Sequence, residues 1–350
     1  MKPGKLPVTQ KRGAMHMTTI QDVAKHAHVG VATVSRVLNE CGYVKADTRE
    51  KVMSAIRELN YTPNEMARNL YHKKTGIVAI IIPEVSHPYF AEFTNAAEIA
   101  LFRKGYQTMI CNTWREQNYE TYYLELLKKQ RVDGIITGVH TLDIEQYQEV
   151  NRPIVALDRQ LGDQIPFVAV DHEKGGRMAA QLLINAGCKT VLQCTGHRKV
   201  STPSNARHEV FEQVMKEHSI VCHNYLLKWN GFQYSDYADA ALKIAENFGN
   251  LDGYFATDVM AVTLIQTLEA KGRKYPEDFK IVAYDGTYLS RVPYPKLTTI
   301  VQPIDQLADV CVNLLIDRIQ GKPVGKKCIQ LEVTLREGDS TKPFPSGRGK

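Results

Sequence analysis

Residues 19–39 read TIQDVAKHAHVGVATVSRVLN. Thr19 and Asp22 have the spacing of an N-terminal capping box, which predicts a short helix over 19–27. Gly30 breaks the helical pattern, and a second short helix is expected over 31–39. The stretch therefore predicts two short helices joined by a tight turn.

The apolar positions of these helices indicate which faces are buried. The residues expected to face inward are Ile20, Val23, Ala24 and Ala27 in the first helix and Val31, Val34, Val37 and Leu38 in the second. A third helix is expected over 47–60, with Val52, Ala55, Ile56 and Leu59 inside, and it ends because Pro63 disfavours helical geometry at Thr62. Three short helices with a tight first turn are typical of a helix-turn-helix.

The segments on either side of this motif are less regular. Residues 1–17 lack apolar periodicity, and we expect a disordered tail or a segment added in cloning. Residues 64–71 are long enough for two helical turns but are apolar only at Met66, Ala67 and Leu70. A helix this short is marginal alone, so it needs a partner that covers its apolar stripe. Residues 73–76 are typical of a linker.

From Ile77 onward, short apolar runs alternate with helical patterns. The predicted strands are 77–83, 107–111, 134–137, 154–157, 168–170, 191–194, 254–256 and 281–283. The predicted helices are 89–104, 119–130, 175–186, 206–217, 237–248 and 259–271. Buried strands separated by helices predict parallel sheets covered on both faces, and so many strands favour an α/β body of two doubly wound lobes.

Charge and cysteine usage exclude several classes of protein. The net charge of +6 is concentrated at the N-terminus, because residues 1–76 hold 13 Lys and Arg against 6 Asp and Glu, whereas the rest hold 31 against 32. A basic module on a near-neutral body is typical of a polyanion binder with a second function. Seven cysteines without a Cys-x-x-Cys pair favour a reducing cytoplasm. No apolar run approaches the roughly 20 residues of a membrane span.

Polar residues follow many of the predicted strands, where ligands of open α/β sheets bind. They are Glu84, Ser86, Asn112, His140, Asp158, Arg159, Asp171, Thr195, Asp258, Asp285 and Gln302. Carboxylates accept paired hydroxyls, and aromatic rings cover the C–H face of a sugar. This set therefore favours a polyhydroxylated ligand, with rings from Tyr89, Phe90 and either Trp229 or Phe232, and with Arg207 as a cation. The alternative for any single aspartate is that it caps the next helix.

Metal and catalytic sites are weakly supported. His218, Cys222 and His223 match no standard zinc spacing, and neither Gly175-Gly176 nor residues 195–199 have the spacing of a phosphate-binding loop. No nucleophile lies beside a plausible base, so we expect neither an enzyme nor a metal nor a cofactor.

Several motifs together closely resemble the lactose/galactose-repressor (LacI/GalR) family of bacterial transcription regulators. The N-terminal motifs are TIQDVA (19–24), ATVSRVLN (32–39), TREKV (48–52) and LNYTPN (59–64). The similarity continues through VDGII (132–136), LDR (157–159), TDVMA (257–261), AYDG (283–286) and LTTIVQP (297–303), and covers about residues 18–340. Within the family the chain is most similar to sucrose and ribose operon repressors of Gram-positive bacteria, through TGVH (137–140) and Asp158-Arg159.

The resemblance implies a DNA-binding mode. The helix from Val31 would lie in the major groove, with Val31 and Ala32 at base-reading positions and Arg36 forked onto guanine. The residues implied to contact phosphates are Gln21, Thr33, Ser35, Asn39 and Tyr43. Residues 64–71 match the family's hinge helix, which includes Asn64 and Ala67 and wedges Leu70 into the minor groove.

The resemblance also implies the domain organisation and the partners. The effector would lie between the lobes, and the positions that match the family are Tyr89, Phe90, Asp158, Arg207, Asp258 and Asp285. The expected parts are a tail (1–17), a helix-turn-helix domain (18–62), a hinge helix and linker (63–76), a two-lobed body (77–340) and a tail (341–350). The N-lobe would hold about 77–170 and 304–331, and the C-lobe about 171–302 and 332–340. The partners implied are a palindromic operator in double-stranded DNA, a second copy of the chain, and a sugar or sugar phosphate.

Departures from the family pattern and other functions leave alternatives open. Gly30 replaces a capping Ser, and Ala206-Arg207-His208 and Ala283-Tyr-Asp-Gly286 differ from the usual motifs, which leaves the effector's identity open. A catabolite-control regulator with a phosphoprotein corepressor would need a basic face, for which Arg103-Lys104 or Lys128-Lys129 are candidates. A soluble sugar-binding protein and an α/β enzyme are weaker alternatives.

Overall fold

The computed structural model describes residues 18–62, 74–113, 119–139, 143–196, 202–323 and 327–344. The chain divides into two compact units, Met1–Thr75 and Gly76–Lys350. Within the described ranges, no helix is long and apolar enough to cross a membrane.

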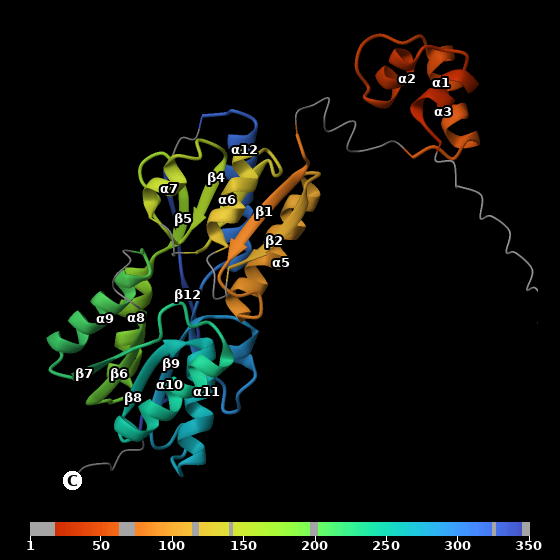
Figure 1. The fold of residues 1–350 in the computed structure, drawn as a ribbon. Helices are drawn as coiled ribbons and strands as arrows, with labels where there is room; N and C mark the ends of the chain where they lie inside the picture. The colour runs from red at the N-terminus through yellow and green to blue at the C-terminus, as the bar shows by residue number, and fades with distance from the viewer. Residues whose placement is uncertain are drawn as a thin grey trace, which may run out of the picture. The chain divides into compact units, whose positions relative to one another are not determined.

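The described residues 18–62 of the first unit form a three-helix domain (Figure 1) made of α1 (Ile20–His26), α2 (Val31–Leu38) and α3 (Ala46–Glu58). The predicted capping box is present, because Asp22 N donates to Thr19 Oγ1 over 3.3 Å and Thr19 N donates to Asp22 Oδ2 over 2.9 Å. The helices surround a small core of Val23, Ala24, Ala27, Val34, Val37, Val52 and Ala55. The predicted helix-turn-helix fold is confirmed.

One residue of the predicted inward face is exposed. Val31 lies on the same helical stripe as Val34 and Val37, yet its side chain is 42% exposed, whereas both others are buried. Val31 is the first residue of α2, and the core formed with α1 and α3 begins only one turn later. The periodicity of the sequence could not show where along the helix the covering helices stop.

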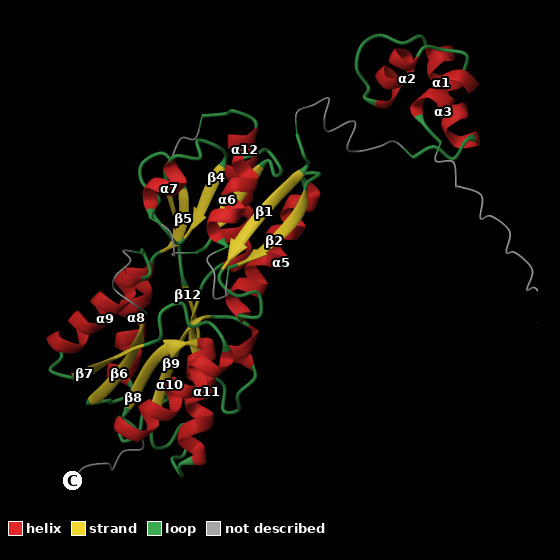
Figure 2. Ribbon diagram, viewed as in Figure 1, coloured by secondary structure: helices red, strands yellow, loops and turns green. Residues whose placement is uncertain are grey.

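The N-lobe of the second unit contains a six-stranded parallel sheet (Figure 2) in the order β11-β5-β4-β3-β1-β2. Its strands are β1 (Ile77–Ile82), β2 (Gln107–Asn112), β3 (Gly134–Thr137), β4 (Ile154–Leu157), β5 (Phe167–Val170) and β11 (Cys328–Leu331). Alternate residues of β1 face opposite layers. Val78, Ile80 and Ile82 pack with α5 (Pro88–Arg103) and α12 (Ile304–Ile319), whereas Ala79 and Ile81 pack with α6 (Glu120–Lys128) and α7 (Ile144–Gln148).

The C-lobe repeats this arrangement with the order β12-β10-β9-β8-β6-β7. Its strands are β6 (Thr190–Thr195), β7 (Val221–Leu226), β8 (Gly253–Thr257), β9 (Lys280–Asp285), β10 (Thr298–Val301) and the antiparallel β12 (Thr334–Arg336). One face packs on α8 (His172–Asn185) and α9 (Asn205–Glu217), and the other on α10 (Tyr234–Asn247) and α11 (Asp258–Ala270). A short 3-10 helix, η1 (Tyr288–Arg291), follows β9.

The chain passes between the lobes three times, after β5, β10 and β11. The predicted α/β body with two parallel sheets is confirmed, and all eight predicted strands and all six predicted helices are present. The strands β7, β10, β11 and β12 and the helices α7 and α12 were not predicted. β7 lacks a continuous apolar run because it is an edge strand on which exposed and partly buried residues mix.

Candidate functional site

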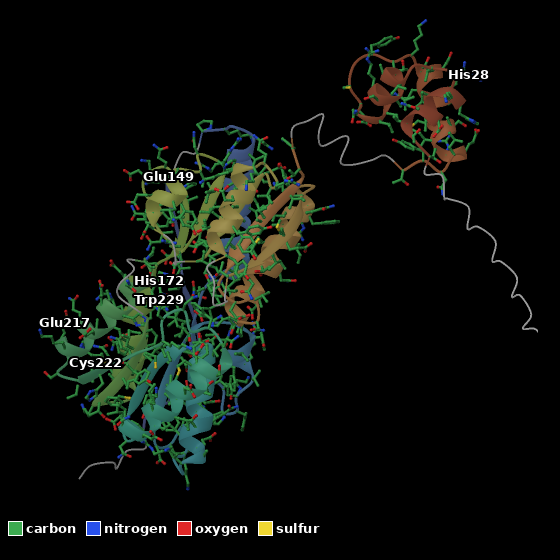
Figure 3. All side chains as sticks on the ribbon, in the orientation of Figure 1. His28, Glu149, His172, Glu217, Cys222 and Trp229 are labelled. Atoms are coloured by element: carbon green, nitrogen blue, oxygen red, sulfur yellow. The ribbon has the colours of Figure 1, made fainter. Side chains whose placement is uncertain are left out.

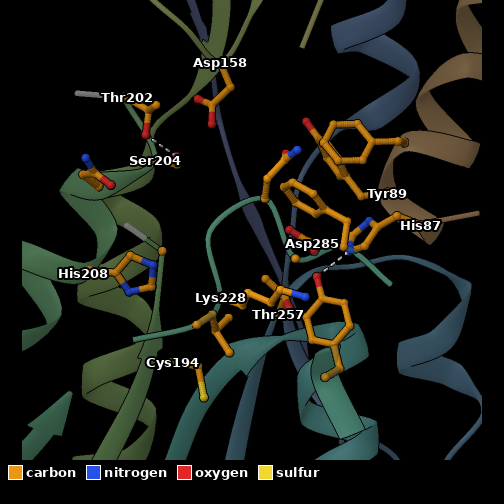
Figure 4. Close-up of a pocket in the computed structure, with 18 of the residues that line it drawn as sticks. His87, Tyr89, Asp158, Cys194, Thr202, Ser204, His208, Lys228, Thr257 and Asp285 are labelled. Carbon is orange, nitrogen blue, oxygen red and sulfur yellow. Dashed lines mark hydrogen bonds between the residues drawn. The ribbon is translucent and has the colours of Figure 1, made fainter. Parts of the chain in front are cut away.

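A cavity of about 220 Å³ lies between the two lobes (Figure 4). The carboxyl ends of the strands of both sheets approach it, as expected for open α/β sheets. The sequence-predicted residues that line it are Tyr89, Phe90, Asp158, Arg207, Trp229, Phe232, Asp285 and Gln302. Figure 3 shows Trp229 at the level where the lobes meet. These side chains come from both lobes, so one ligand could contact both.

The cavity combines the chemistry that a sugar requires. Asp158 follows β4 in the N-lobe, and Asp285 ends β9 in the C-lobe, so the two carboxylates approach from opposite lobes. The guanidinium of Arg207 lies 4.4 Å from the centroid of the Tyr284 ring, in a cation–π contact that orients it. Aromatic rings and hydrogen-bonding groups therefore surround the same small volume.

Asp285 is held in an unusual electrostatic state. Its Oδ1 accepts a hydrogen bond from Gln302 Nε2 over 2.9 Å, and the side chain is buried. Burial, together with the nearby Asp258 carboxylate, raises the pKa of Asp285 to about 8, against the opposing effect of Arg207. A ligand that supplies hydroxyl donors would favour the ionised form.

Several predicted residues do not line the cavity, among them Asp258 and Ser86. Asp258 is fully buried, and its carboxylate accepts hydrogen bonds from Thr287 N (2.6 Å), Thr287 Oγ1 (2.7 Å) and Thr299 Oγ1 (2.9 Å). Burial raises the pKa of Asp258 to about 6. Ser86 instead donates to Glu84 Oε1 over 3.1 Å. The side chains of Asp258 and Ser86 therefore form hydrogen bonds within the protein and do not face the cavity.

Other strand-end residues show why no single one is decisive. Asp171 caps α8, because its Oδ1 accepts from Lys174 N over 2.8 Å, which is the alternative expected for such aspartates. Arg159 is buried in the N-lobe, where its Nη1 donates to Val139 O over 2.7 Å and lies 3.8 Å from Glu120 Oε1. His140 lies outside the described residues. Among the described residues, no group of three or more His, Cys, Asp or Glu is placed to hold a metal ion.

The sequence did not single out the residues that join the lobes at one end of the cavity. His87, from the N-lobe, lies with its Nε2 3.1 Å from the hydroxyl of Tyr237 on α10 of the C-lobe. Its ring also contacts Phe90 and Phe232, and its Nδ1 is buried without a hydrogen-bond partner. Burial lowers the pKa of His87 to about 4, so the ring is neutral near pH 7. No local pattern marks this histidine, because its partner Tyr237 lies 150 positions away in the sequence.

The predicted DNA-reading residues gather on the exposed side of α2. Val31, Ala32 and Arg36 are exposed, as are Gln21 on α1 and Tyr43 after α2. The residues Thr33, Ser35 and Asn39 are partly buried, and Asn39 Nδ2 donates to Ser35 Oγ over 3.2 Å. Asn64, Ala67 and Leu70 lie outside the described residues.

The N-terminus of α2 offers a stability prediction. Gly30 is the N-cap, with an extended backbone (φ −73°) and no side-chain hydrogen bond, and a Cβ atom there would meet nothing within 4 Å. We expect Gly30→Ser to stabilise α2 by a few tenths of a kcal/mol, since a serine cap accepts an otherwise unpaired N–H. Amide hydrogen exchange within α2 measures this. Faster exchange in the variant would contradict the open geometry at Gly30.

Comparison with known proteins decides the family. The model of bacterial regulatory proteins of the lacI family matches residues 19–64, and that of the periplasmic binding protein-like domain matches residues 168–341. The ribose operon repressor of Halalkalibacterium halodurans is 38% identical over 327 residues, which cover 93% of this chain and 98% of that protein. The chain belongs to the LacI family.

Two further proteins of this kind are similar to the chain over most of its length. The sucrose operon repressor of Pediococcus pentosaceus is 38% identical over 86% of this chain and 92% of its own length. The crystal structure of the Lac repressor dimer bound to operator and the anti-inducer ONPF is similar with a TM-score of 0.79 and 26% identity, over 93% of this chain and 99% of that one. The predicted resemblance to ribose and sucrose operon repressors is confirmed, and these relatives are named as repressors, not as enzymes.

Proposed function

We propose that this LacI-family protein represses a carbohydrate-utilisation operon, and that a sugar bound between the lobes of its body controls its affinity for operator DNA. The observation that carries the proposal is one chain with both an exposed recognition helix and an interlobe cavity lined by Asp158, Arg207 and Asp285. The family membership and the repressor relatives support it. Closure of the lobes on a ligand would change the arrangement of the DNA-binding units in a dimer.

The dimensions and chemistry of the cavity favour a monosaccharide or its phosphate. Pockets for drug-sized ligands measure about 300–1,000 Å³, whereas this one measures about 220 Å³. The neutral ring of His87, with its buried and unpartnered Nδ1, suits a hydroxyl rather than an ion. We propose His87, Tyr237, Arg207, Asp158 and Asp285 as the polar groups that hold the sugar.

On the DNA side, we propose that Arg36 reads a guanine and that Val31 and Ala32 contact neighbouring bases in the major groove. Gln21, Tyr43 and the partly buried hydroxyls of Thr33 and Ser35 would then donate to phosphates. Such contacts are spaced for a palindrome only in a dimer.

Exposed apolar side chains support a homodimer. On the N-lobe, Phe102 of α5 is 75% exposed and Ile110 of the edge strand β2 is 51% exposed. On the C-lobe, Tyr288, Val292 and Tyr294 are likewise exposed. Large exposed apolar residues in both lobes favour burial against a second copy of the chain.

A phosphoprotein corepressor has less support. Both Lys128 and Lys129 lie close to Glu125, at 3.2 Å and 3.6 Å, so part of the basic face considered for such a partner is neutralised within the chain.

All seven cysteines are free thiols, which supports action in a reducing cytoplasm, where operator DNA lies.

The proposed function is tested with the purified full-length chain. Selection from a pool of random duplexes is expected to return a two-fold symmetric site. The complex with that site is then titrated with D-ribose, D-fructose, sucrose, D-ribose 5-phosphate and D-fructose 6-phosphate. We expect at least one to change operator affinity by about tenfold or more, a coupling free energy of about 1.4 kcal/mol. Equal affinity for every duplex, or no response to any sugar, would contradict the proposal.

A further inference from the structure

Two side chains outside the cavity connect the charged residues inside it. His172, the first residue of α8, places its Nε2 2.8 Å from Asp158 Oδ1 and its Nδ1 3.0 Å from the Tyr284 hydroxyl. The ring of Tyr284 also contacts the cation, since the Arg207 guanidinium lies 4.4 Å from the ring centroid. We call Asp158, His172, Tyr284 and Arg207 the interlobe relay. Figure 3 shows His172 at the junction of the two lobes.

The two central members of the interlobe relay are fixed by burial. His172 is 3% and Tyr284 is 1% exposed, and neither lines the cavity, whereas Asp158 and Arg207 both do. The relay also crosses between lobes, because Asp158 follows β4 of the N-lobe and the other three belong to the C-lobe. The ligand-facing carboxylate and the ligand-facing guanidinium are therefore linked through buried groups that a ligand does not touch.

Two glycines allow this close approach. Gly175 and Gly176 lie three and four positions after His172 and so share its face of α8. A Cβ atom at Gly175 would lie 2.7 Å from the Tyr284 hydroxyl, and one at Gly176 would lie 2.2 Å from the carbonyl oxygen of Arg207. The glycine pair does not have the spacing of a phosphate-binding loop. Its lack of side chains allows α8 to pack directly against the Tyr284 ring and the Arg207 backbone.

The two hydrogen-bond partners of His172 suit one tautomer of its ring. An ionised carboxylate only accepts hydrogen bonds, so His172 Nε2–H donates to Asp158. In that tautomer Nδ1 is left to accept the Tyr284 O–H, and burial raises the pKa of Tyr284, which keeps that proton in place. Asp158 has a left-handed backbone with φ +52°, a conformation that aspartate adopts more readily than most residues.

We propose that His172 and Tyr284 are positioning residues, which set the spacing of Asp158 and Arg207 across the cleft and thereby couple sugar binding to the joining of the two lobes. The inference rests on the proposed sugar site. Without the hydrogen bonds of the relay, every cavity-lining side chain would keep its chemical groups, but Asp158 and Arg207 would be free to move apart. The affinity for sugar would then fall although no group that contacts the sugar had been removed.

Three variants of the full-length chain separate positioning from simple packing. His172→Leu keeps approximate volume but breaks both hydrogen bonds, whereas His172→Gln retains a donor for Asp158 and an acceptor for Tyr284. Tyr284→Phe keeps the ring under Arg207 and removes only the hydroxyl. Calorimetry measures the affinity for sugar. It uses whichever of D-ribose, D-fructose, sucrose or their phosphates binds the wild type. Amide hydrogen exchange in the absence of sugar measures the local stability of residues 158–172.

We expect His172→Leu to weaken sugar binding about 10- to 100-fold and Tyr284→Phe about 3- to 10-fold, while His172→Gln stays within about threefold of wild type. Exchange over residues 158–172 should rise in His172→Leu alone, with the strand cores of both lobes unchanged. Wild-type affinity in both His172→Leu and Tyr284→Phe would overturn the proposal. If no sugar binds the wild type, the proposed function fails, and unchanged exchange in His172→Leu would then separately overturn the relay.

Discussion

Replacing Asp285 with asparagine is expected to abolish the response of operator binding to sugar while leaving operator binding itself intact. Asparagine keeps the shape and can still accept from Gln302 Nε2, which lies 2.9 Å from Asp285 Oδ1 in the wild type. It loses the charge that would hold sugar hydroxyls in a buried site, where each charge-assisted hydrogen bond contributes about 1.5–3 kcal/mol. Two such bonds correspond to a loss of affinity of about 100-fold or more. Titration of the operator complex with the responsive sugar measures this.

Whereas Asp285→Asn is expected to remove the sugar response, it is expected to make the folded chain more stable than the wild type at pH 8. Burial raises the pKa of Asp285 to about 8, above the unfolded value of about 3.9, so the folded chain binds a proton that the unfolded chain has released. This stabilisation is fully present below about pH 4 and is lost as the pH rises through 8. Asp285→Asn removes that dependence, while the smaller contribution from Asp258, with a pKa of about 6, remains.

Urea denaturation at pH 5 and pH 8 therefore provides the control for folding. The wild type is expected to lose more stability between these pH values than Asp285→Asn, and Asp163→Asn, an exposed change of the same kind, should match the wild type in both assays. A variant that loses the sugar response and is also the less stable chain at pH 8 would indicate a folding defect rather than a lost ligand contact.

The fold could be predicted where physical patterns are local. Capping at Thr19, helical periodicity and the apolar strands of the two sheets identified the helix-turn-helix and the doubly wound body. The edge strand β7 and the three-residue β12 were missed because neither has a continuous apolar run. Helix α12 does carry a signal, since Leu307, Cys311 and Leu315 recur at helical spacing and are buried.

The candidate site was predictable only in part, because strand ends converge but side-chain partners do not show in a sequence. Asp158, Asp258 and Asp285 look equivalent in the sequence as strand-end acids. The Asp258 carboxylate, however, accepts hydrogen bonds from Thr287 and Thr299. The hydrogen bonds between His87 and Tyr237 and between His172 and Asp158 join residues 150 and 14 positions apart. Only packing of the two lobes brings such pairs together.

Arg36→Ala is expected to weaken binding to the selected operator about 10- to 100-fold for each half-site, with far less effect on random DNA. Arg36 is exposed in the last turn of α2, and its side chain lies beside Gly42. A Cβ atom added at Gly42 would lie 3.6 Å from Arg36 Cδ. A guanidinium forked onto guanine contributes about 1–3 kcal/mol of base discrimination, whereas a contact with a phosphate weakens all sequences alike. Fluorescence anisotropy with the selected duplex and a scrambled duplex, each at several salt concentrations, measures both terms.

Two further variants isolate the base-reading role. Arg57→Ala removes the same charge from an exposed position on α3, so it is expected to shift specific and non-specific binding equally or not at all. Arg36→Lys keeps the charge but loses the planar fork, so it should retain affinity for random DNA and lose preference for the selected base. Equal losses of Arg36→Ala on both duplexes would assign Arg36 to the DNA backbone, and base selectivity would then rest on Val31 and Ala32, whose apolar side chains favour a thymine methyl group.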